Sequence, residues 1–464
     1  MRFLSNIWVT NESEILFNRR VKHADPSDFT GDHDVNIFLL TRTGFLIVVL
    51  SVSHAASSAN YEPGTMTVPA SSLLAADILQ GEHYKIADDV LISGYMNHYT
   101  VDSDFGPFTA VGNRNLKKLL HEFIAIAELK KMTSVSVGTD AAVDAVADTG
   151  KSLAALASDP EGSLDNLGAG VSRLFKRTKK AAKDVSAQAS EAETEAATGE
   201  EESSESDMTS QLASSYLGIG KAQREIASEL KVDPYSDNPV LQAELARVGK
   251  ISGTVGKVTK IMIPIPSVVG TAASVSNLVW NLSPTDLLIQ NQETLKALGY
   301  SESLIQQFFS NTFYSPTEQT AFVTAVKSLD SAKGREILLQ NAVKVETAIE
   351  AEFMGRSVLF AQVYHEQVEP VKEIIASSTA LVPVVITTSG DGIIFAPLDQ
   401  LSWTEEVEEV VTELARLMDE HGGSDEHLLW VEGDISELAL TKLKSGGWVE
   451  KSAAFDKLER IIKD

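Results

Sequence analysis

Helical spacing of apolar residues dominates the middle of the chain. Over residues 212–375, apolar positions recur every three or four residues, as they do in a helix with one buried face. Ser315 and Glu318 have the spacing of a capping box, which marks a helix start. Residues 331–369 give a longer helical pattern, with Gly334 and Gly355 as candidate breaks. We therefore expect a central helical domain over residues 212–375.

Shorter, strand-like patterns lie on both sides of this region. Residues 99–111 contain two runs of β-branched and aromatic residues around a turn, which predicts a hairpin, and a helix with an apolar stripe follows from Asn113. Residues 383–395 predict a second hairpin with a Gly-Asp-Gly turn. The first element expected after it is a helix that a second capping box, Ser402 and Glu405, opens, with residues up to Met418 facing inward. A strand at 427–431, a helix at 436–444 and a strand at 448–449 are expected to follow. This ββαβαβ order indicates some parallel pairing. The predicted fold class is α+β, mainly α, with a small mixed N-terminal unit, a central helical domain and a small C-terminal α/β unit.

The most apolar window of the first hundred residues has the features of an export signal. Residues 44–52 are uncharged and apolar, Arg42 precedes them, and the small residues SHAASSA follow. A short apolar run with these flanks is typical of a secretory signal peptide, here with cleavage after Ala55. Nine residues are too few to span a bilayer comfortably. We expect export to the periplasm or beyond, with an uncleaved N-terminal anchor or a buried strand as alternatives.

The segment before this window fits a signal peptide poorly. Residues 1–34 are long and polar, with Asp25, Asp28, Asp32 and Asp34 close to the apolar run. We expect translation to start near residues 35–40 and residues 1–34 to be a non-native extension.

Composition changes again between the two halves of the chain. Residues 134–183 are rich in Ala, Gly, Asp and Ser, and no Lys or Arg occurs from 184 through 220. Low hydrophobicity with dense negative charge is typical of a solvated linker. The expected organisation is an extension at 1–34, a signal peptide at 35–59, a hairpin-plus-helix unit at 60–133, a linker at 134–211, the helical domain at 212–375 and the α/β unit at 376–464.

Net charge and cysteine content exclude several classes of function. The 464 residues carry a formal charge of −26 and no cysteine. A net charge this negative repels the phosphates of nucleic acids, and we therefore expect no nucleic-acid partner. Disulfides, thiolate metal sites and Cys nucleophiles are excluded, and we expect no cofactor.

His98, Asp102 and Asp104 are the first candidate site. On one strand they would share a face, because side chains alternate with a period of two. Such a group could hold a divalent metal or form an acid/base pair. The alternative is an ordinary hairpin facing water. His365 is a further candidate, although a histidine near a helix end is also an ordinary stabiliser of that end.

Two more groups could bind metal ions. Asp233 and Asp237 could offer oxygens to Ca²⁺, but the EF-hand spacing is absent and Asx turns beside proline explain them better. His421 and His427 lie six residues apart in a Gly-rich connection, which could hold a metal ion. Residues 389–392 lack a phosphate-loop pattern and predict a hairpin turn.

Residues 251–282 form an apolar segment rich in Gly, Ala and Ser. Small residues allow helices to pack closely, either in a bundle or in a membrane. Pro264 and Pro266 interrupt the run, so a simple spanning helix is not expected. The segment predicts a buried helix pair, with a membrane-contacting hairpin as the alternative.

Several stretches together resemble one family. They read YTVDSDFGPFTAVGNRNLKKLLHE, VDPYSDNPVLQ, FYSPTEQTAFVTAV with GREILLQNA, and LLWVEGDISELALTKLKSGGWVE. They resemble an uncharacterised family of predicted exported bacterial proteins with no assigned function, over most of the chain after residue 80. The shared stretches are fold-like and not catalytic, so the resemblance implies a bacterial envelope protein and assigns no site residue.

The sequence therefore predicts an exported envelope protein with a non-catalytic role, binding a protein or a membrane surface. One alternative is an envelope hydrolase that uses His98, Asp102 and Asp104, or His365. Another is a membrane-active protein that uses residues 251–282. No motif identifies a small-molecule ligand.

Overall fold

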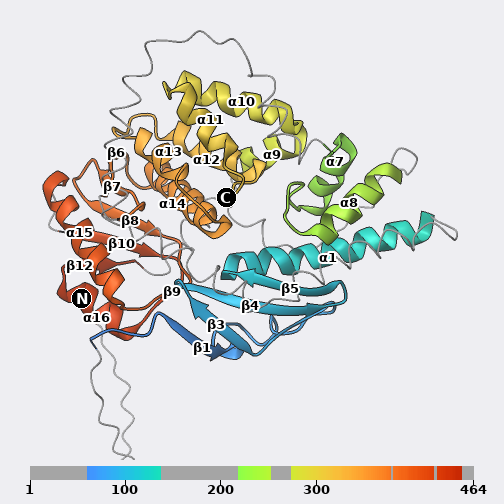
Figure 1. Cartoon of the computed structure of the whole chain (residues 1–464), viewed down its shortest axis with the longest axis horizontal. Helices are drawn as coiled ribbons and strands as arrows, with labels where there is room; N and C mark the ends of the chain where they lie inside the picture. Colours follow the sequence, from blue (N-terminus) through green and yellow to red (C-terminus); the bar gives the residue numbers. More distant parts are fainter. Residues whose placement is uncertain (1–59, 137–217, 252–272, 378–379, 423–425, 452–464) are drawn as a thin grey trace, which may run out of the picture. The chain divides into compact units, whose positions relative to one another are not determined.

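The structure is a computed structural model that describes residues 60–136, 218–251, 273–377, 380–422 and 426–451 (Figure 1). In these residues the fold is mixed α+β and mainly α. The expected extension at 1–34, the signal peptide at 35–59 with its cleavage site at Ala55, and residues 137–211 of the expected linker lie outside the described residues. Residues 252–272 of the apolar segment also lie outside them.

A five-stranded antiparallel sheet begins the described chain. Its strands are β1 (Thr65–Pro69), β2 (Tyr84–Ile86), β3 (Asp89–Ser93), β4 (Met96–Ser103) and β5 (Gly106–Val111), with the short helix η1 (Ala70–Ser72) after β1. β3 and β2 both pair with β4. β5 pairs with residues 98–103 of β4, which include residues that also pair with β3 or β2. β5 therefore lies along the opposite edge of β4, and β1 lies outside β3. The hairpin predicted at 99–111 is confirmed as β4 and β5.

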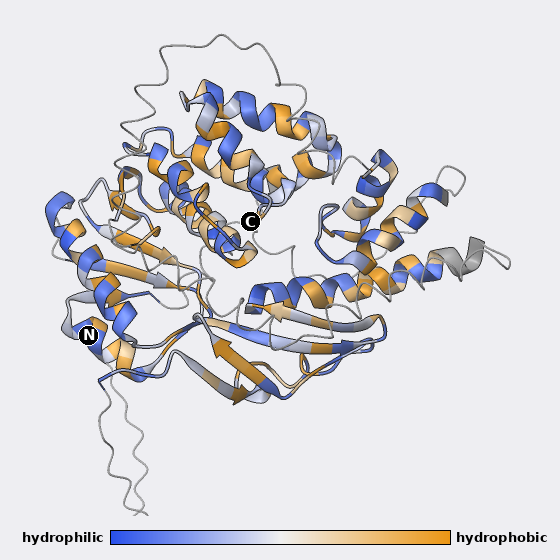
Figure 2. Cartoon of the chain, viewed as in Figure 1, coloured by the Kyte–Doolittle hydropathy of each residue, from blue (hydrophilic) through white to orange (hydrophobic). Residues whose placement is uncertain are grey.

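Three helices pack against this sheet around a shared core. They are α1 (Asn113–Ser136), α7 (Lys221–Leu230) and α8 (Pro239–Ile251). Phe123 of α1 is fully buried and meets the rings of Phe105 and Phe108 with centroids 5.8 and 5.1 Å apart. Apolar residues of α7 and α8 join the same cluster. The predicted amphipathic helix from Asn113 is confirmed, and Figure 2 shows apolar and polar residues alternating along it.

The described residues 273–367 form six further helices. They are α9 (Ala273–Asn281), α10 (Pro284–Ala297), α11 (Glu302–Ser310), α12 (Pro316–Ser328), α13 (Glu336–Ala342) and α14 (Ala348–Gln367). The capping box is confirmed, because Ser315 accepts the Glu318 N–H and the Glu318 carboxylate accepts the Ser315 N–H. The pattern at 331–369 is two helices, since Thr347 caps a new start at α14. The break expected at Gly355 is wrong, because this residue lies inside α14.

A second sheet, of five strands, closes the chain in the order β12-β10-β8-β7-β6. Its elements are β6 (Val371–Ile375), β7 (Val384–Thr387), β8 (Gly392–Ala396), α15 (Glu405–His421), β10 (His427–Val431), α16 (Glu437–Ser445) and β12 (Trp448–Glu450), with the small pair β9 (Gln400–Leu401) and β11 (Asp434–Ile435) beside it. β8, β10 and β12 are parallel, and β7 and β8 form the predicted hairpin. The capping box predicted at Ser402 and Glu405 is wrong, because the Thr404 hydroxyl caps α15 by accepting the Val407 N–H. β6 lies in the stretch expected to be helical. That expectation is wrong for residues 371–375, because Pro370 ends the helix and the buried residues that follow pair with β7.

The hydrophobic cores combine segments from different parts of the chain. α7 and α8, within the stretch expected to be one helical domain, share the core of the first sheet. The largest cluster joins α10–α14 to the second sheet, and it also takes in Tyr95 and Met96 from the tip of the β3–β4 hairpin. Tyr95 has a φ of 66°, and Gly94 before it has 57°. This tight turn, with both φ angles positive, brings the Tyr95 ring of the first sheet into the core of the second.

Candidate functional site

Asp399 connects its own loop with three distant segments of the chain, two of them through its carboxylate. Asp399, in the connection between β8 and β9, accepts the main-chain N–H of Asn97 at 2.9 Å and that of Asn113 at 3.1 Å. Its own main chain donates to the Tyr95 carbonyl at 3.2 Å and accepts from Asp434 N–H at 2.9 Å. The first N–H groups of a helix have no partner within the helix, and a negative charge is favourable there. Asp399 therefore serves the start of α1 from a remote loop.

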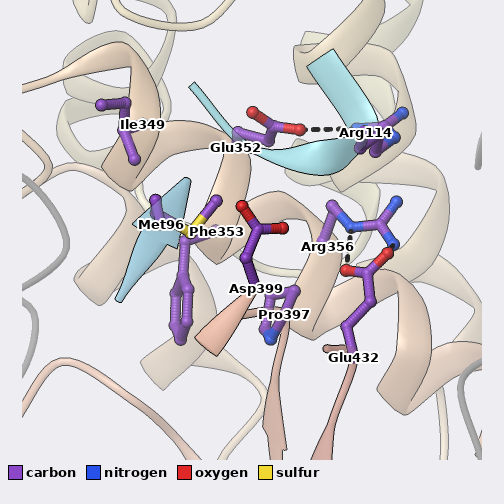
Figure 3. Close-up of a pocket in the computed structure, with 10 residues that line it drawn as sticks. Met96, Arg114, Ile349, Glu352, Phe353, Arg356, Pro397, Asp399 and Glu432 are labelled. Carbon is purple, nitrogen blue, oxygen red and sulfur yellow. Dashed lines mark hydrogen bonds and ion pairs between the residues drawn. The ribbon is translucent and has the colours of Figure 1, made fainter. Parts of the chain in front are cut away.

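Two ion pairs lie beside this carboxylate, and we call the whole group the Asp399 hub. Arg114, in the first turn of α1, contacts Glu352 of α14 at 3.0 Å. Arg356, one turn further along α14, forms a two-pronged pair with Glu432, which follows β10. Figure 3 shows both pairs and Asp399 around one hollow. The hub thus joins α1, α14 and the second sheet through charges that face one another.

Burial sets the charge of the hub. Asp399 is 8% exposed, and burial raises its pKa from 3.8 to about 7. The N–H groups of Asn97 and Asn113 favour the charged form, while the carboxylates of Glu432 and Glu352 oppose it. With Asp399 protonated, the two arginines balance the two glutamates. With Asp399 ionised, the hub carries one net negative charge.

The hollow in the hub is small. The volume open to the centre of a water molecule is about 10 Å³, which is roughly the space of one water. Pockets that hold metabolites are typically several hundred Å³. The hub contains no hydroxyl or thiol beside a base, so its arrangement suits holding segments together better than chemistry on a ligand.

The first sequence candidates do not converge. His98 is buried, and its Nε2 lies 3.1 Å from the Ser93 carbonyl oxygen. Burial lowers the His98 pKa, although that hydrogen bond opposes the shift. Asp102 is exposed on β4, and Asp104 pairs with His83 at 2.9 Å. The His–Asp pair that forms involves His83, a residue the sequence did not single out, and it lies at the surface.

His365 has a structural partner near the end of α14. Its Nδ1 accepts the Val371 N–H at 2.9 Å, which fixes the start of β6. Glu369 instead accepts from the Thr388 hydroxyl at 2.7 Å and from the Ser389 N–H. Burial of Glu369 opposes its charge, but these hydrogen bonds outweigh that effect and lower its pKa. The Ser389 segment is the predicted hairpin turn, held by Glu369.

The candidate metal ligands have separate partners as well. Asp233 accepts the Tyr235 N–H at 2.8 Å, as in an Asx turn, and the Thr317 hydroxyl at 2.7 Å. Asp237 pairs with Lys118 at 3.2 Å. The described residues contain no group of three or more His, Cys, Asp or Glu side chains placed to hold a metal ion.

The two C-terminal histidines do not form a joint site. The Nε2 of His427 lies 2.9 Å from Asp419, and its ring packs on Trp448 with centroids 5.4 Å apart. His421 lies 3.9 Å from Glu373 of β6. Each histidine therefore has its own carboxylate partner, on a different element.

A second polar cluster involves Glu122 of α1. This residue is 3% exposed, and it accepts hydrogen bonds from the Ser236 hydroxyl at 2.6 Å and the Asn238 side chain at 3.0 Å. Burial raises its pKa, against the effects of Lys118 and these two donors. The cluster joins the stretches LKKLLHE and VDPYSDNP, and the Asp233–Thr317 contact adds FYSPTEQ. Three of the stretches that carried the family resemblance thus meet here as a packing joint.

The apolar segment is described only at its end. In α9, Val275 and Val279 are buried in a small core with Tyr235 and Leu287. The Trp280 indole donates to the Val232 carbonyl at 3.1 Å. This part of the segment is a helix with one buried face, and the rest of the predicted helix pair lies outside the described residues. None of the described helices has the length and apolar character needed to cross a membrane.

Sequence reasoning missed the hub. Glu352 and Arg356 are four residues apart on a helix, which places them on one face, but such pairs are common. Gly433 was the better signal: a Cβ there would lie 2.0 Å from the Asp399 carbonyl oxygen, so only glycine fits. Without the fold, nothing connects that glycine with Asp399.

Comparisons with known proteins give no relative for this chain. No family model, no curated protein and no solved structure matches it.

Proposed function

We propose that this chain is an exported bacterial envelope protein that acts by binding another protein and has no catalytic step. The observation that carries the non-catalytic part is the use made of the polar candidates. His98, Asp233 and His365 each hold a main-chain group of a neighbouring segment. A general acid or base works within reach of a substrate and of the other catalytic groups, whereas these side chains lie apart, each bonded to the main chain of its own turn or strand end.

The Asp399 hub supports the same proposal. Its charges face one another across α1, α14 and the loops of the second sheet, around space for about one water molecule. Such a joint holds its parts in one arrangement. We propose that a small mixed N-terminal unit, a central helical domain and a small C-terminal α/β unit act together as a scaffold that presents a binding surface.

Export is supported by the sequence. The apolar run at 44–52, Arg42 before it and the small residues around Ala55 have the order of a signal peptide. The resemblance to predicted exported bacterial proteins points the same way. The alternative of an N-terminal anchor uses the same segment.

Export can be tested with a reporter that is active only outside the cytoplasm. Residues 1–59 are fused to this reporter in a bacterial host, and a second fusion starts at residue 35. We expect activity from both, and we expect Val48→Arg to abolish it, because a charge at the centre of the apolar run blocks insertion. N-terminal sequencing of the released product is expected to begin at Ala56. Activity that survives Val48→Arg, or an intact Met1 on the mature protein, would contradict the proposal.

Binding to protein is to be separated from binding to membrane. In a flotation experiment with vesicles that contain anionic lipid, we expect the mature chain to stay at the bottom of the gradient, unbound, because its net charge is strongly negative. Flotation with the vesicles would support the membrane-active alternative that uses residues 251–282.

A further inference from the structure

The outer strands of the first sheet differ in how their free edges are protected. An edge strand presents unpaired N–H and C=O groups, and proteins usually guard them with Lys, Pro or a very short strand. β5 carries Pro107, and β2 has only three residues, with Lys85 at its centre. β1 has five residues, TMTVP, with a proline only at its last position. It is the least guarded edge of this sheet.

β1 is also accessible. Four of its five residues are exposed, and Met66 is 42% exposed. It pairs with β3 from Thr65↔Ser93 to Pro69↔Asp89 and with no other strand in the described part of the chain. An extended segment can therefore add to its free side through main-chain hydrogen bonds.

Charge around β1 indicates what kind of segment would fit. Residues 60–112 contain seven acidic residues and one basic residue, Lys85. Asp88 and Asp89 are exposed at the Pro69 end of β1. These carboxylates favour a positively charged partner.

The chain segment that precedes β1 leads to another acidic surface. Tyr61 donates to Glu408 of α15 at 2.6 Å. That hydrogen bond, and the nearby charges of Glu405 and Glu409, raise the Tyr61 pKa. β1 thus has carboxylates near both of its ends. A second copy of this chain, with a net charge of −26, is repelled from such a surface.

We propose that β1 is a docking strand that takes up an extended, basic segment of another protein as a further strand of the first sheet. This inference rests on the proposed function, because it names the surface and the partner of the proposed binding. The main chain of β1 supplies the hydrogen bonds, and the surrounding carboxylates select a basic sequence.

A labelled peptide tests the proposal on the full chain. The probe alternates Thr and Val over five residues between two Lys at each end, and the control probe has Pro at the second and fourth of the five central positions. Binding is measured by fluorescence anisotropy at low and high salt. We expect the first probe to bind at least tenfold more tightly than the second. We also expect binding of the first probe to weaken as the salt concentration increases.

Matched variants locate the binding. Thr67→Lys places a charge on the free edge, and Thr100→Lys makes the same change at an exposed position of the central strand β4. We expect Thr67→Lys to weaken binding of the probe at least tenfold. Thr100→Lys should change the affinity for the probe by less than about threefold. Hydrogen exchange with bound probe is expected to slow at residues 65–69, which measures the contact directly.

Several outcomes would overturn the docking strand. They are no binding by the unaltered chain, equal loss in the two lysine variants, or slowed exchange only outside residues 65–69. Circular dichroism of each variant confirms that it is folded. These results are independent of the reporter assay, so an exported chain that fails to bind the probe refutes this inference alone, and a failed export assay leaves the peptide result standing.

Discussion

The carboxylate of Asp399 accepts the main-chain N–H of Asn113 at 3.1 Å, across 286 positions of the sequence. Asn113 is the first residue of α1, so a loop of the second sheet completes the helix that covers the first. Helix starts are commonly capped by a side chain from the preceding residue. Here Gly112 precedes the helix, with a φ of 95° and no side chain to offer, and a distant aspartate takes that role.

Removing the Asp399 carboxylate should destabilise the whole unit. Asp399→Ala leaves the buried N–H of Asn97 and the partly buried N–H of Asn113 without this acceptor, and an unsatisfied buried polar group costs about 1–3 kcal/mol. The free energy of unfolding is measured by urea denaturation. The control is Asp77→Ala, at an exposed position, which should change it by less than about 0.5 kcal/mol. Equal effects of the two variants would show that Asp399 has no special role.

The raised pKa of Asp399 predicts a particular pH dependence. Between pH 4 and pH 7 the folded chain keeps a proton on Asp399, whose pKa is about 7, while the unfolded chain has released it near 3.8. The free energy of unfolding should therefore fall as pH rises through this window, because the folded state binds more protons. The rise of the Asp399 pKa from 3.8 to about 7 corresponds to a loss of at most about 4 kcal/mol in the free energy of unfolding across this window.

Asp399→Asn isolates this contribution. The amide oxygen can still accept the two main-chain hydrogen bonds, but the group no longer titrates. Burial also raises the pKa of Glu122 and Glu318, which gives slopes of the same sign, so the difference between wild type and variant is the quantity to measure. We expect wild type to lose stability relative to Asp399→Asn between pH 4 and pH 7. If the free energy of unfolding of wild type and of Asp399→Asn changed in parallel with pH, the prediction would be contradicted.

Local elements could be predicted from the sequence because their signals are local. The hairpin of β4 and β5, the capping box at Ser315 and the Gly-Asp-Gly turn between β7 and β8 each depend on a few neighbouring residues. β6 was missed because only three residues separate its five residues from the end of a long helix. Its assignment depends on pairing with β7, which is a tertiary interaction.

The hub could not be predicted for the same reason. Arg114, Glu352, Arg356 and Glu432 are ordinary polar residues of helices and loops until the fold brings them together. His98 shows the converse. A histidine predicted to share a strand face with Asp102 and Asp104 suggested chemistry, yet its ring is buried and hydrogen-bonded to the Ser93 carbonyl. Single residues of reactive type are therefore weak signals when their partners lie far away in the sequence.

The Arg356–Glu432 pair should show strong coupling. The Arg356 side chain is 6% exposed, so Arg356→Met leaves Glu432 partly buried beside Asp399 and Glu352, with its countercharge removed. Breaking a buried pair typically costs about 3–5 kcal/mol, and removing both charges often restores stability. We expect Arg356→Met with Glu432→Gln to be more stable than Arg356→Met alone. The exposed pair of Arg416 and Glu420 is the control, with a coupling below about 1 kcal/mol.

Gly433 should tolerate no side chain, because its backbone lies against that of the hub. A Cβ at this position would be 2.0 Å from the Asp399 carbonyl oxygen and 2.5 Å from the carbonyl carbon, and backbone atoms cannot move aside cheaply. Gly433→Ala should therefore push Asp399 away from Asn97 and Asn113 and lower the free energy of unfolding by more than about 2 kcal/mol. Gly64→Ala is the matched control, because nothing lies within 4 Å of a Cβ there. The free energy of unfolding of the two variants is measured by urea denaturation. If Gly433→Ala left it unchanged, the β10–β11 connection could shift without disturbing the start of α1.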